Sequence, residues 1–101
     1  MNQFGEKIKA LRERKTLLQR HVATQLNIDT PMLSKIERGE RHAKREQVLL
    51  LSKIFNVEAD DLMSLWLADK LFDIIKNEDA GLKALAVTEI EFNKLKKKLR
   101  K

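Results

Sequence analysis

The sequence predicts an all-α protein, and three observations support this fold class. Helix formers dominate the composition, whereas the 101 residues include only 3 Gly and 1 Pro, the residue types that interrupt helices most strongly. Apolar residues recur every three or four positions, which is the period of a helix with one buried face. Apolar residues make up 43% of the chain, enough for a compact helical core with an appendage.

Two short helices are predicted near the N-terminus. Phe4, Ile8 and Leu11 fall on one stripe of a helix over about residues 2–14, because positions i, i+4 and i+7 share a helix face. A second helix is expected over about residues 19–26. Its inward face consists of Val22, Ala23 and Leu26.

A tight turn and a third helix follow. Asn27 is suited to the left-handed conformation that ends a helix and turns the chain, and Asp29 is a favourable N-cap for the next helix. We expect this helix over about residues 30–38, with Pro31 in its first turn and Gly39 as its left-handed C-terminal cap. The inward side chains are those of Leu33 and Ile36.

The middle of the chain shows a similar pattern, in which an amphipathic helix is followed by an Asn and an apolar residue. A fourth helix is predicted over about residues 45–55, and Asn56 followed by the apolar Val57 resembles the earlier turn. A fifth helix begins near Ala59 or Asp60. The apolar residues of these two helices are Val48, Leu51, Ile54, Phe55, Leu62, Met63, Leu65 and Trp66.

The pattern stays helical beyond Trp66, with a break expected at residues 77–81 and a last helix over about 82–99. This tail carries more apolar residues than five packed helices need, and we expect them to form a homodimer interface. The alternative is a tail that folds back on its own domain. The end from Lys94 to Lys101 is strongly basic, which suits the negative end of a helix dipole. The apolar residues of the tail are Leu71, Phe72, Ile74, Ile75, Leu82, Leu85, Phe92, Leu95 and Leu99.

The residue types limit the classes of function. The net charge of +6 favours a polyanionic partner, although ordinary charged faces would produce the same balance. The chain has no Cys, which excludes disulfide scaffolds, cysteine-ligated zinc and thiol catalysis. No signal-peptide run is present, and no stretch approaches the roughly 18 apolar residues of a membrane span. We therefore expect a cytoplasmic protein with no membrane association.

No catalytic or metal-binding pattern is present. The two histidines, His21 and His42, lack a His, Asp or Glu partner at metal-binding helical spacing. No serine lies in a triad-like pattern, and there is no Gly-rich phosphate loop. We predict that the chain is not an enzyme and has no cofactor and no metal.

The segment from Gln19 to Gly39 has the layout of a DNA-binding helix-turn-helix, although two helices joined by a turn occur in many folds. Its residue pattern is more specific and resembles the phage repressor and Cro (XRE) family over about residues 4–66. The resemblance implies a five-helix repressor-like domain over residues 1–67 and a C-terminal helical extension over residues 68–101. It rests on Leu11-Arg12-Glu13-Arg14, Gln19, Val22-Ala23, Leu26-Asn27-Ile28-Asp29, Leu33-Ser34-Lys35-Ile36-Glu37-Arg38-Gly39, Leu51-Ser52, Phe55-Asn56-Val57 and Asp61-Leu62.

The resemblance implies that the third helix enters the major groove of DNA as the recognition helix. Lys35 then suits hydrogen bonding to guanine O6 and N7, and Gln19 matches a family residue that grips phosphate and supports the recognition helix. Arg12 and Glu37 match a buried ion pair that aims this helix. The positions that face base edges or nearby phosphates are Thr30, Pro31, Ser34 and Lys35, and those that touch the DNA backbone are Arg38, Arg41, His42 and Arg45.

The chain departs from the family pattern at four positions. Leu18 stands where a Ser or Thr normally caps the second helix, Asn27 replaces a Gly, and Ser52 replaces an Ala. Pro31 replaces a polar residue that often contacts a base, and its side chain cannot donate or accept a hydrogen bond. The DNA sequence that is bound therefore cannot be inferred from relatives.

The function predicted from the sequence is that of a sequence-specific, double-stranded DNA-binding transcription regulator. We expect a homodimer on a palindromic operator, acting as a repressor or as a protein similar to a restriction-modification controller. One alternative is the DNA-binding antitoxin of a toxin-antitoxin pair, whose tail would bind a protein partner. Another is a protein-protein adaptor that keeps the fold without binding DNA, which salt-insensitive or absent duplex binding would indicate.

Overall fold

The structure is a computed structural model, and it describes residues 1–100; the last residue of the predicted basic end, Lys101, lies outside the described residues. The described chain is entirely helical apart from its turns, which confirms the predicted all-α class. It divides into two compact units, residues 1–71 and the chain from Phe72 onward. The helices are α1 (Gln3–Arg14), α2 (Gln19–Leu26), α3 (Thr30–Glu37), α4 (Arg45–Phe55), α5 (Ala59–Ile75) and α6 (Gly81–Leu99).

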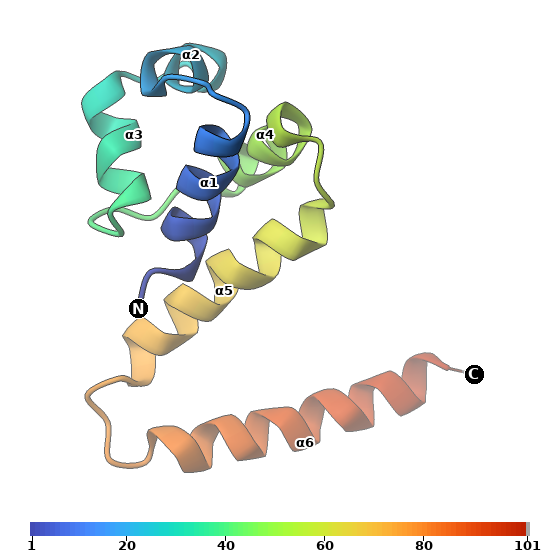
Figure 1. Cartoon of the computed structure of the whole chain (residues 1–101). Helices are drawn as coiled ribbons and strands as arrows, with labels where there is room; N and C mark the ends of the chain where they lie inside the picture. Colours follow the sequence, from blue (N-terminus) through green and yellow to red (C-terminus); the bar gives the residue numbers. More distant parts are fainter. Residues whose placement is uncertain (101) are drawn as a thin grey trace. The chain divides into compact units, whose positions relative to one another are not determined.

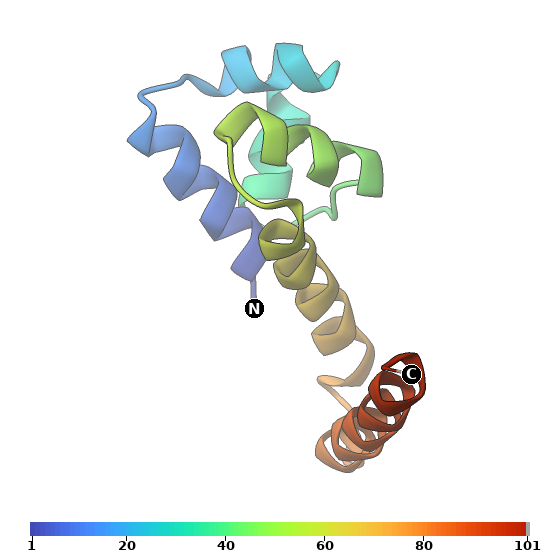
Figure 2. The ribbon, with the colours of Figure 1, turned by 90° about the vertical axis from the view of Figure 1, so that its right-hand side faces the viewer.

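The first unit packs α1 to α4 and most of α5 around a single core (Figures 1 and 2). Inward residues predicted from the helical period are buried: Leu33, Val48 and Leu51 have no exposed surface. Partly buried residues such as Ile28 and Val57, which follow the two left-handed turns, pack against this core. The largest fully buried side chains are those of Ile8, Leu33, Leu51, Leu62, Val22 and Val48.

Left-handed residues end three of the helices where the sequence indicates a turn. Asn27, Asn56 and Gly39 have φ angles of 58°, 54° and 76°. After α3, the N–H of Gly39 donates to the carbonyl of Ile36, and the N–H of Glu40 donates to that of Lys35. These two bonds form a Schellman motif, which satisfies carbonyls that the helix itself leaves free. Between α2 and α3, the turn that begins at Asn27 spans residues 27–29 only, the short connection typical of a helix-turn-helix.

Several element boundaries differ slightly from the predictions. The first helix begins at Gln3, the third ends at Glu37 with Arg38 as its C-cap, and the last begins at Gly81. The start of α2 has no capping side chain at Leu18, but the Nδ1 atom of His21 accepts the Leu18 N–H at 3.2 Å. His21, in the first turn of α2, thus satisfies the N–H of the residue that precedes the helix.

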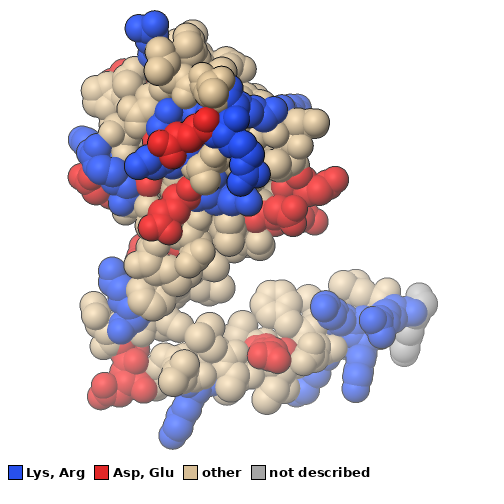
Figure 3. Space-filling view, viewed as in Figure 1, with Lys and Arg blue, Asp and Glu red and all other residues tan. Residues whose placement is uncertain are grey.

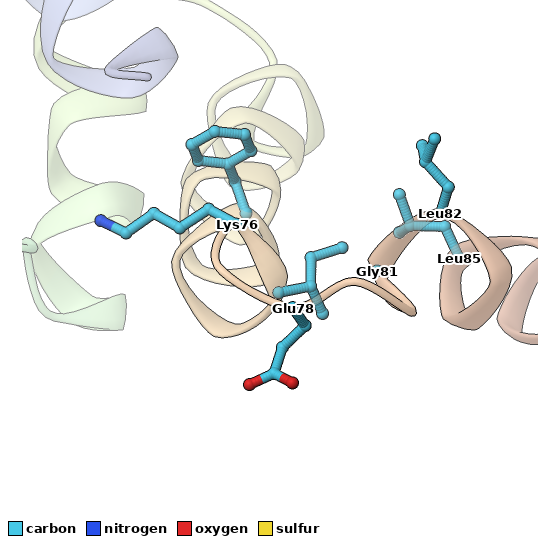
Figure 4. Close-up of a pocket in the computed structure, with 7 residues that line it drawn as sticks. Lys76, Glu78, Gly81, Leu82 and Leu85 are labelled. Atoms are coloured by element: carbon cyan, nitrogen blue, oxygen red, sulfur yellow. The ribbon is translucent and has the colours of Figure 1, made fainter.

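The second unit consists of the last turn of α5, a turn and α6, and it has almost no interior of its own. Gly81 is its one buried residue among those described, and Ile74 and Leu82 are 72% and 83% exposed. The end of α5 and the start of α6 border an open hollow of about 220 Å³ (Figure 4). It is lined by Phe72, Ile75, Lys76, Glu78, Gly81, Leu82 and Leu85.

Candidate nucleic-acid interface

The helix α3 presents one face to the core and the other to solvent. Leu33 and Ile36 anchor its inner face, with 0% and 3% of their surfaces exposed. The Asp29 carboxylate accepts the Met32 N–H at 2.8 Å and so caps the start of the helix. The side chains on the other face are exposed or half-buried: Thr30, Pro31, Ser34 and Lys35. This outer face is not covered by other elements of the first unit, and Figure 1 shows α3 at the edge of that unit.

Cationic residues follow α3 directly in the chain. Arg38, Arg41, His42 and Arg45 are all exposed, as is the neighbouring Lys44. Figure 3 shows patches of Lys and Arg side chains on the visible face of the first unit, with acidic side chains among them. A surface of this charge suits contact with a phosphate backbone.

Arg38 already has partners on the protein. Its guanidinium donates hydrogen bonds to the carboxylate of Glu40 and to the hydroxyl of Ser34. The hydrogen bond from Arg38 is the main reason that the pKa of the Glu40 carboxyl is lowered. Both side chains of the Arg38–Glu40 pair are more than half exposed, so water and salt screen it strongly. A contact of Arg38 or Ser34 with DNA would replace weak surface hydrogen bonds.

Arg45 lies against the body of the protein. Its guanidinium carbon is 5.1 Å from the centroid of the Trp66 ring, and its Nη1 is 3.6 Å from the Met63 sulfur. The Lys70 Nζ is 3.7 Å from the same ring centroid, and the Trp66 N–H donates to the Ala43 carbonyl at 2.7 Å. Trp66 thus holds α5 against the segment that carries the cationic residues.

The structure brings together Arg12, Gln19 and Glu37 at the inner side of α3. The Nε of Arg12 donates to Oε2 of Glu37 at 2.8 Å, and its Nη2 donates to Oε1 at 3.0 Å. Oε1 also accepts a hydrogen bond from Nε2 of Gln19 at 2.9 Å. The Glu37 side chain is 3% exposed and that of Arg12 is 11% exposed. Glu37 therefore receives a bidentate partner from α1 and a second donor from α2.

This network fixes the position of α3. Hydrogen bonding to Glu37 raises the pKa of the Arg12 guanidinium above its ordinary value, so the arginine stays charged. Arg12 also donates from Nη1 to the Leu17 carbonyl at 2.9 Å, which connects the pair to the α1–α2 turn. No described side chain has a buried polar atom without a hydrogen-bond partner, as a fully satisfied buried network requires.

Two residues that the sequence analysis did not single out join α1 to other helices. Asn2 accepts the Gly5 N–H through Oδ1 at 3.1 Å and donates from Nδ2 to the Glu37 carbonyl at 2.8 Å. The buried carboxylate of Asp69 accepts the N–H groups of Gln3 and Phe4. An Asn before a helix is a recognisable cap signal, whereas nothing in the local sequence marks Asp69.

Other kinds of site find no support in the part of the chain that the structure describes. No group of three or more His, Cys, Asp or Glu residues there could hold a metal ion. None of the described helices has both the length and the apolar character needed to cross a membrane.

The fold and the exposed face of α3 define a helix-turn-helix DNA-binding domain. A family model described as Helix-turn-helix matches residues 8–62, and the chain belongs to the helix-turn-helix family of transcription regulators, which are not enzymes. It is similar to the HTH-type transcriptional activator BcrR of Enterococcus faecalis, with 37% identity over 62 residues. The match covers 61% of this chain and 30% of the relative. The chain thus spans less than a third of the length of the relative it matches.

Proposed function

We propose that this protein binds double-stranded DNA in a sequence-specific manner, with α3 in the major groove. The observation that carries the proposal is the orientation of α3. Its apolar face is completely buried through Leu33, while Lys35 on the other face is exposed. A helix whose inner face packs on the core and whose outer face is exposed can enter the major groove of DNA.

The residues along α3 have distinct proposed roles. Lys35 would donate to a guanine edge, which is the commonest kind of specific contact. Thr30 and Ser34 have hydroxyl groups for bases or phosphates, and Pro31 has only an apolar surface to offer. The proposed contacts to the DNA backbone are Gln19, Arg38, Arg41, His42 and Arg45.

Gln19 has a double role in this proposal. Its Nε2 already donates to Glu37 at 2.9 Å, so the side chain helps to hold α3 through the pair with Arg12. The same amide nitrogen has a second N–H, which would donate to a phosphate oxygen together with the first N–H groups of α2.

We further propose that the protein acts as a homodimer on a palindromic operator. Two recognition helices in a dimer read half-sites about 34 Å apart, one turn of DNA. The second unit supports this proposal, because its large apolar side chains remain exposed in the single chain, as with Phe92 at 59% and Leu99 at 76%. A soluble protein rarely leaves such a face uncovered.

Control of transcription is the proposed consequence of operator binding, which would take place in the cytoplasm. Repression follows if the bound dimer blocks polymerase. Activation is the second candidate, favoured by the name of BcrR, an HTH-type transcriptional activator. A reporter placed behind a selected operator distinguishes the two, since deletion of the regulator raises expression for a repressor and lowers it for an activator.

Selection of bound duplexes from a random pool tests the DNA-binding proposal. Enrichment of an inverted repeat supports it, and the absence of salt-sensitive duplex binding would overturn it. Lys35→Ala should weaken binding to the selected site by roughly 1–3 kcal/mol and relax the preference at one base pair. Lys53→Ala, which removes an exposed lysine from α4, is the matched control and should leave the selected motif unchanged.

A further inference from the structure

The helix α6 combines an apolar stripe with an uneven distribution of charge. Leu85, Phe92 and Leu99 are spaced by seven residues, and Leu95 lies on the same side of the helix. Cationic residues gather in its last turns, as Figure 3 shows: Lys94, Lys96, Lys97, Lys98 and Arg100. The segment before the helix carries exposed Glu78 and Asp79 together with Lys76, and Lys83 lies in the first turn of the helix.

The hollow at the start of α6 is the second observation. It has a volume of about 220 Å³, and its walls are largely the apolar side chains of Phe72, Ile75, Leu82 and Leu85 (Figure 4). Gly81 lies at its base, where an added Cβ would be 2.9 Å from the Ile75 carbonyl. The hollow is thus largely apolar and lies beside a turn that carries Glu78 and Asp79 as well as Lys76, and none of the described large side chains of its unit is buried.

We propose that this hollow receives the Leu99 turn of α6 from a second copy of the chain, so that the two α6 helices pair in an antiparallel manner. The inference rests on the proposed dimer and specifies the partner surface and its direction. With the helices overlapping along their full length, Leu99 of one copy lies beside Gly81 of the other. Leu85 then lies beside the second copy's Leu95.

Charge decides between the two directions of pairing. In a parallel pair, the five cations of residues 94–100 would lie beside the same five cations of the second copy, and like charges at such spacing repel. In an antiparallel pair, the basic end of each helix instead lies near residues 78–86 of the other copy, where Glu78 and Asp79 offset the single cation Lys83. The helix dipoles also oppose one another in this arrangement, which is favourable.

The absence of native cysteines allows a direct test by cross-linking. Leu85→Cys and Leu95→Cys variants of the full chain, distinguishable by tags of different length, would be purified singly, mixed, exchanged and oxidised. In the antiparallel pair, identical positions lie about ten residues apart along the axis, roughly 15 Å, beyond the reach of a disulfide. We therefore expect cross-links of mixed length only, and none in either variant alone.

Val87→Cys on the opposite side of α6 is the matched control and should not cross-link in any mixture. Cross-links between identical chains would indicate parallel pairing and overturn the inference. A dimeric mass without any cross-link, or a monomeric mass, would overturn it as well. Duplex binding measured on the same samples separates these outcomes from a failure of the proposed DNA-binding function.

Reversal of charge provides a second readout that does not depend on cysteines. The double variant Lys96→Glu/Arg100→Glu reverses two charges on the Leu85 side of α6 and should weaken the dimer by roughly two- to fivefold for each reversed contact, because these side chains lie near the second copy's Glu78 and Asp79. Mixing it with Glu78→Lys/Asp79→Lys should restore association. A stronger dimer for the first variant alone is the result expected of parallel pairing and would contradict the inference.

Discussion

The carboxylate of Asp69, in α5, accepts the backbone N–H of Phe4, in the first turn of α1, at 2.9 Å. Its other oxygen accepts the N–H of Gln3 at 3.0 Å. The first N–H groups of a helix have no partner within the helix, and a negative charge there is favoured by the helix dipole. A residue late in the first unit thus caps its first helix and joins the part of α5 around Asp69 to that unit.

Removal of this cap should destabilise the protein. Asp69→Ala leaves two N–H groups near the core without partners, and we expect a loss of about 2–3 kcal/mol in the free energy of unfolding. Asp69→Asn keeps the shape but offers only one accepting oxygen, so its effect should be smaller. Urea unfolding followed by circular dichroism measures both losses.

The matched control is Asp73→Ala, which removes an exposed carboxylate one turn further along α5. Its effect should stay within about 0.5 kcal/mol, as for most surface substitutions. Equal losses for Asp69→Ala and Asp73→Ala would show that the capping role assigned to Asp69 is wrong.

Thr16 lies in the left-handed region, with φ of 54°, at the turn between α1 and α2. The left-handed conformation costs a β-branched residue about 1–2 kcal/mol in conformational free energy, whereas glycine adopts it freely. We expect Thr16→Gly to raise the free energy of unfolding by about 1 kcal/mol, after the extra flexibility of the unfolded chain is included. The increase would appear as a higher midpoint in thermal unfolding.

Thr24→Gly is the control for this substitution, because Thr24 lies inside α2 and has ordinary helical geometry. Glycine within a helix costs stability, so the two variants should shift the midpoint in opposite directions. A lower midpoint for Thr16→Gly would mean that the Thr16 side chain stabilises the turn by more than its backbone geometry costs.

Residue type predicts three of the four left-handed positions among the described residues. Asn27, Asn56 and Gly39 could be recognised because Asn and Gly are the residue types that adopt positive φ most readily. Thr16 could not, since threonine rarely adopts it; backbone hydrogen bonds from Thr16 to the Glu13 carbonyl and from Leu17 to the Arg12 carbonyl close this turn. The predicted helices agree with the structure to within about two residues, because their apolar periodicity is a local property of the chain.

Long-range polar contacts were less accessible to prediction. Family resemblance indicated the pair of Arg12 and Glu37, and the structure places these side chains in contact. Asp69 makes its contacts with residues 65 and 66 positions away, and a charged residue in a helix normally indicates a solvated face. The contact between Arg45 and Trp66 likewise depends on packing that no local pattern encodes.

Removing only one member of the buried ion pair of Arg12 and Glu37 should destabilise the protein. Arg12→Met leaves the Glu37 carboxylate buried with Gln19 as its remaining side-chain partner, and loss of one member of a buried pair typically costs about 3–5 kcal/mol. Arg12→Met/Glu37→Met removes both charges and should recover a large part of this loss. Chemical denaturation of the two variants in parallel provides the comparison.

The exposed ion pair of Arg38 and Glu40 provides the control for the comparison of the Arg12 and Glu37 variants. Glu40→Gln removes the partner of Arg38 at the surface, where both side chains are more than half exposed, and should leave unfolding unchanged within error. If the double variant were no more stable than Arg12→Met, the cost would come from lost packing of the arginine stem and not from an unpaired carboxylate.

Salt dependence should distinguish Arg41 from Arg45. Each phosphate contact that is lost reduces the slope of log K against log salt by about 0.9, so Arg41→Ala should lower the slope by this amount and leave stability unchanged. Arg45→Ala should lower the slope and also destabilise the fold by about 0.5–1 kcal/mol, because its guanidinium lies 5.1 Å from the centroid of the Trp66 ring. Fluorescence anisotropy with a selected duplex at several salt concentrations, together with unfolding of each variant, separates the two effects. An unchanged slope for Arg45→Ala would show that this arginine serves the packing of α4 against α5 and does not contact the DNA backbone.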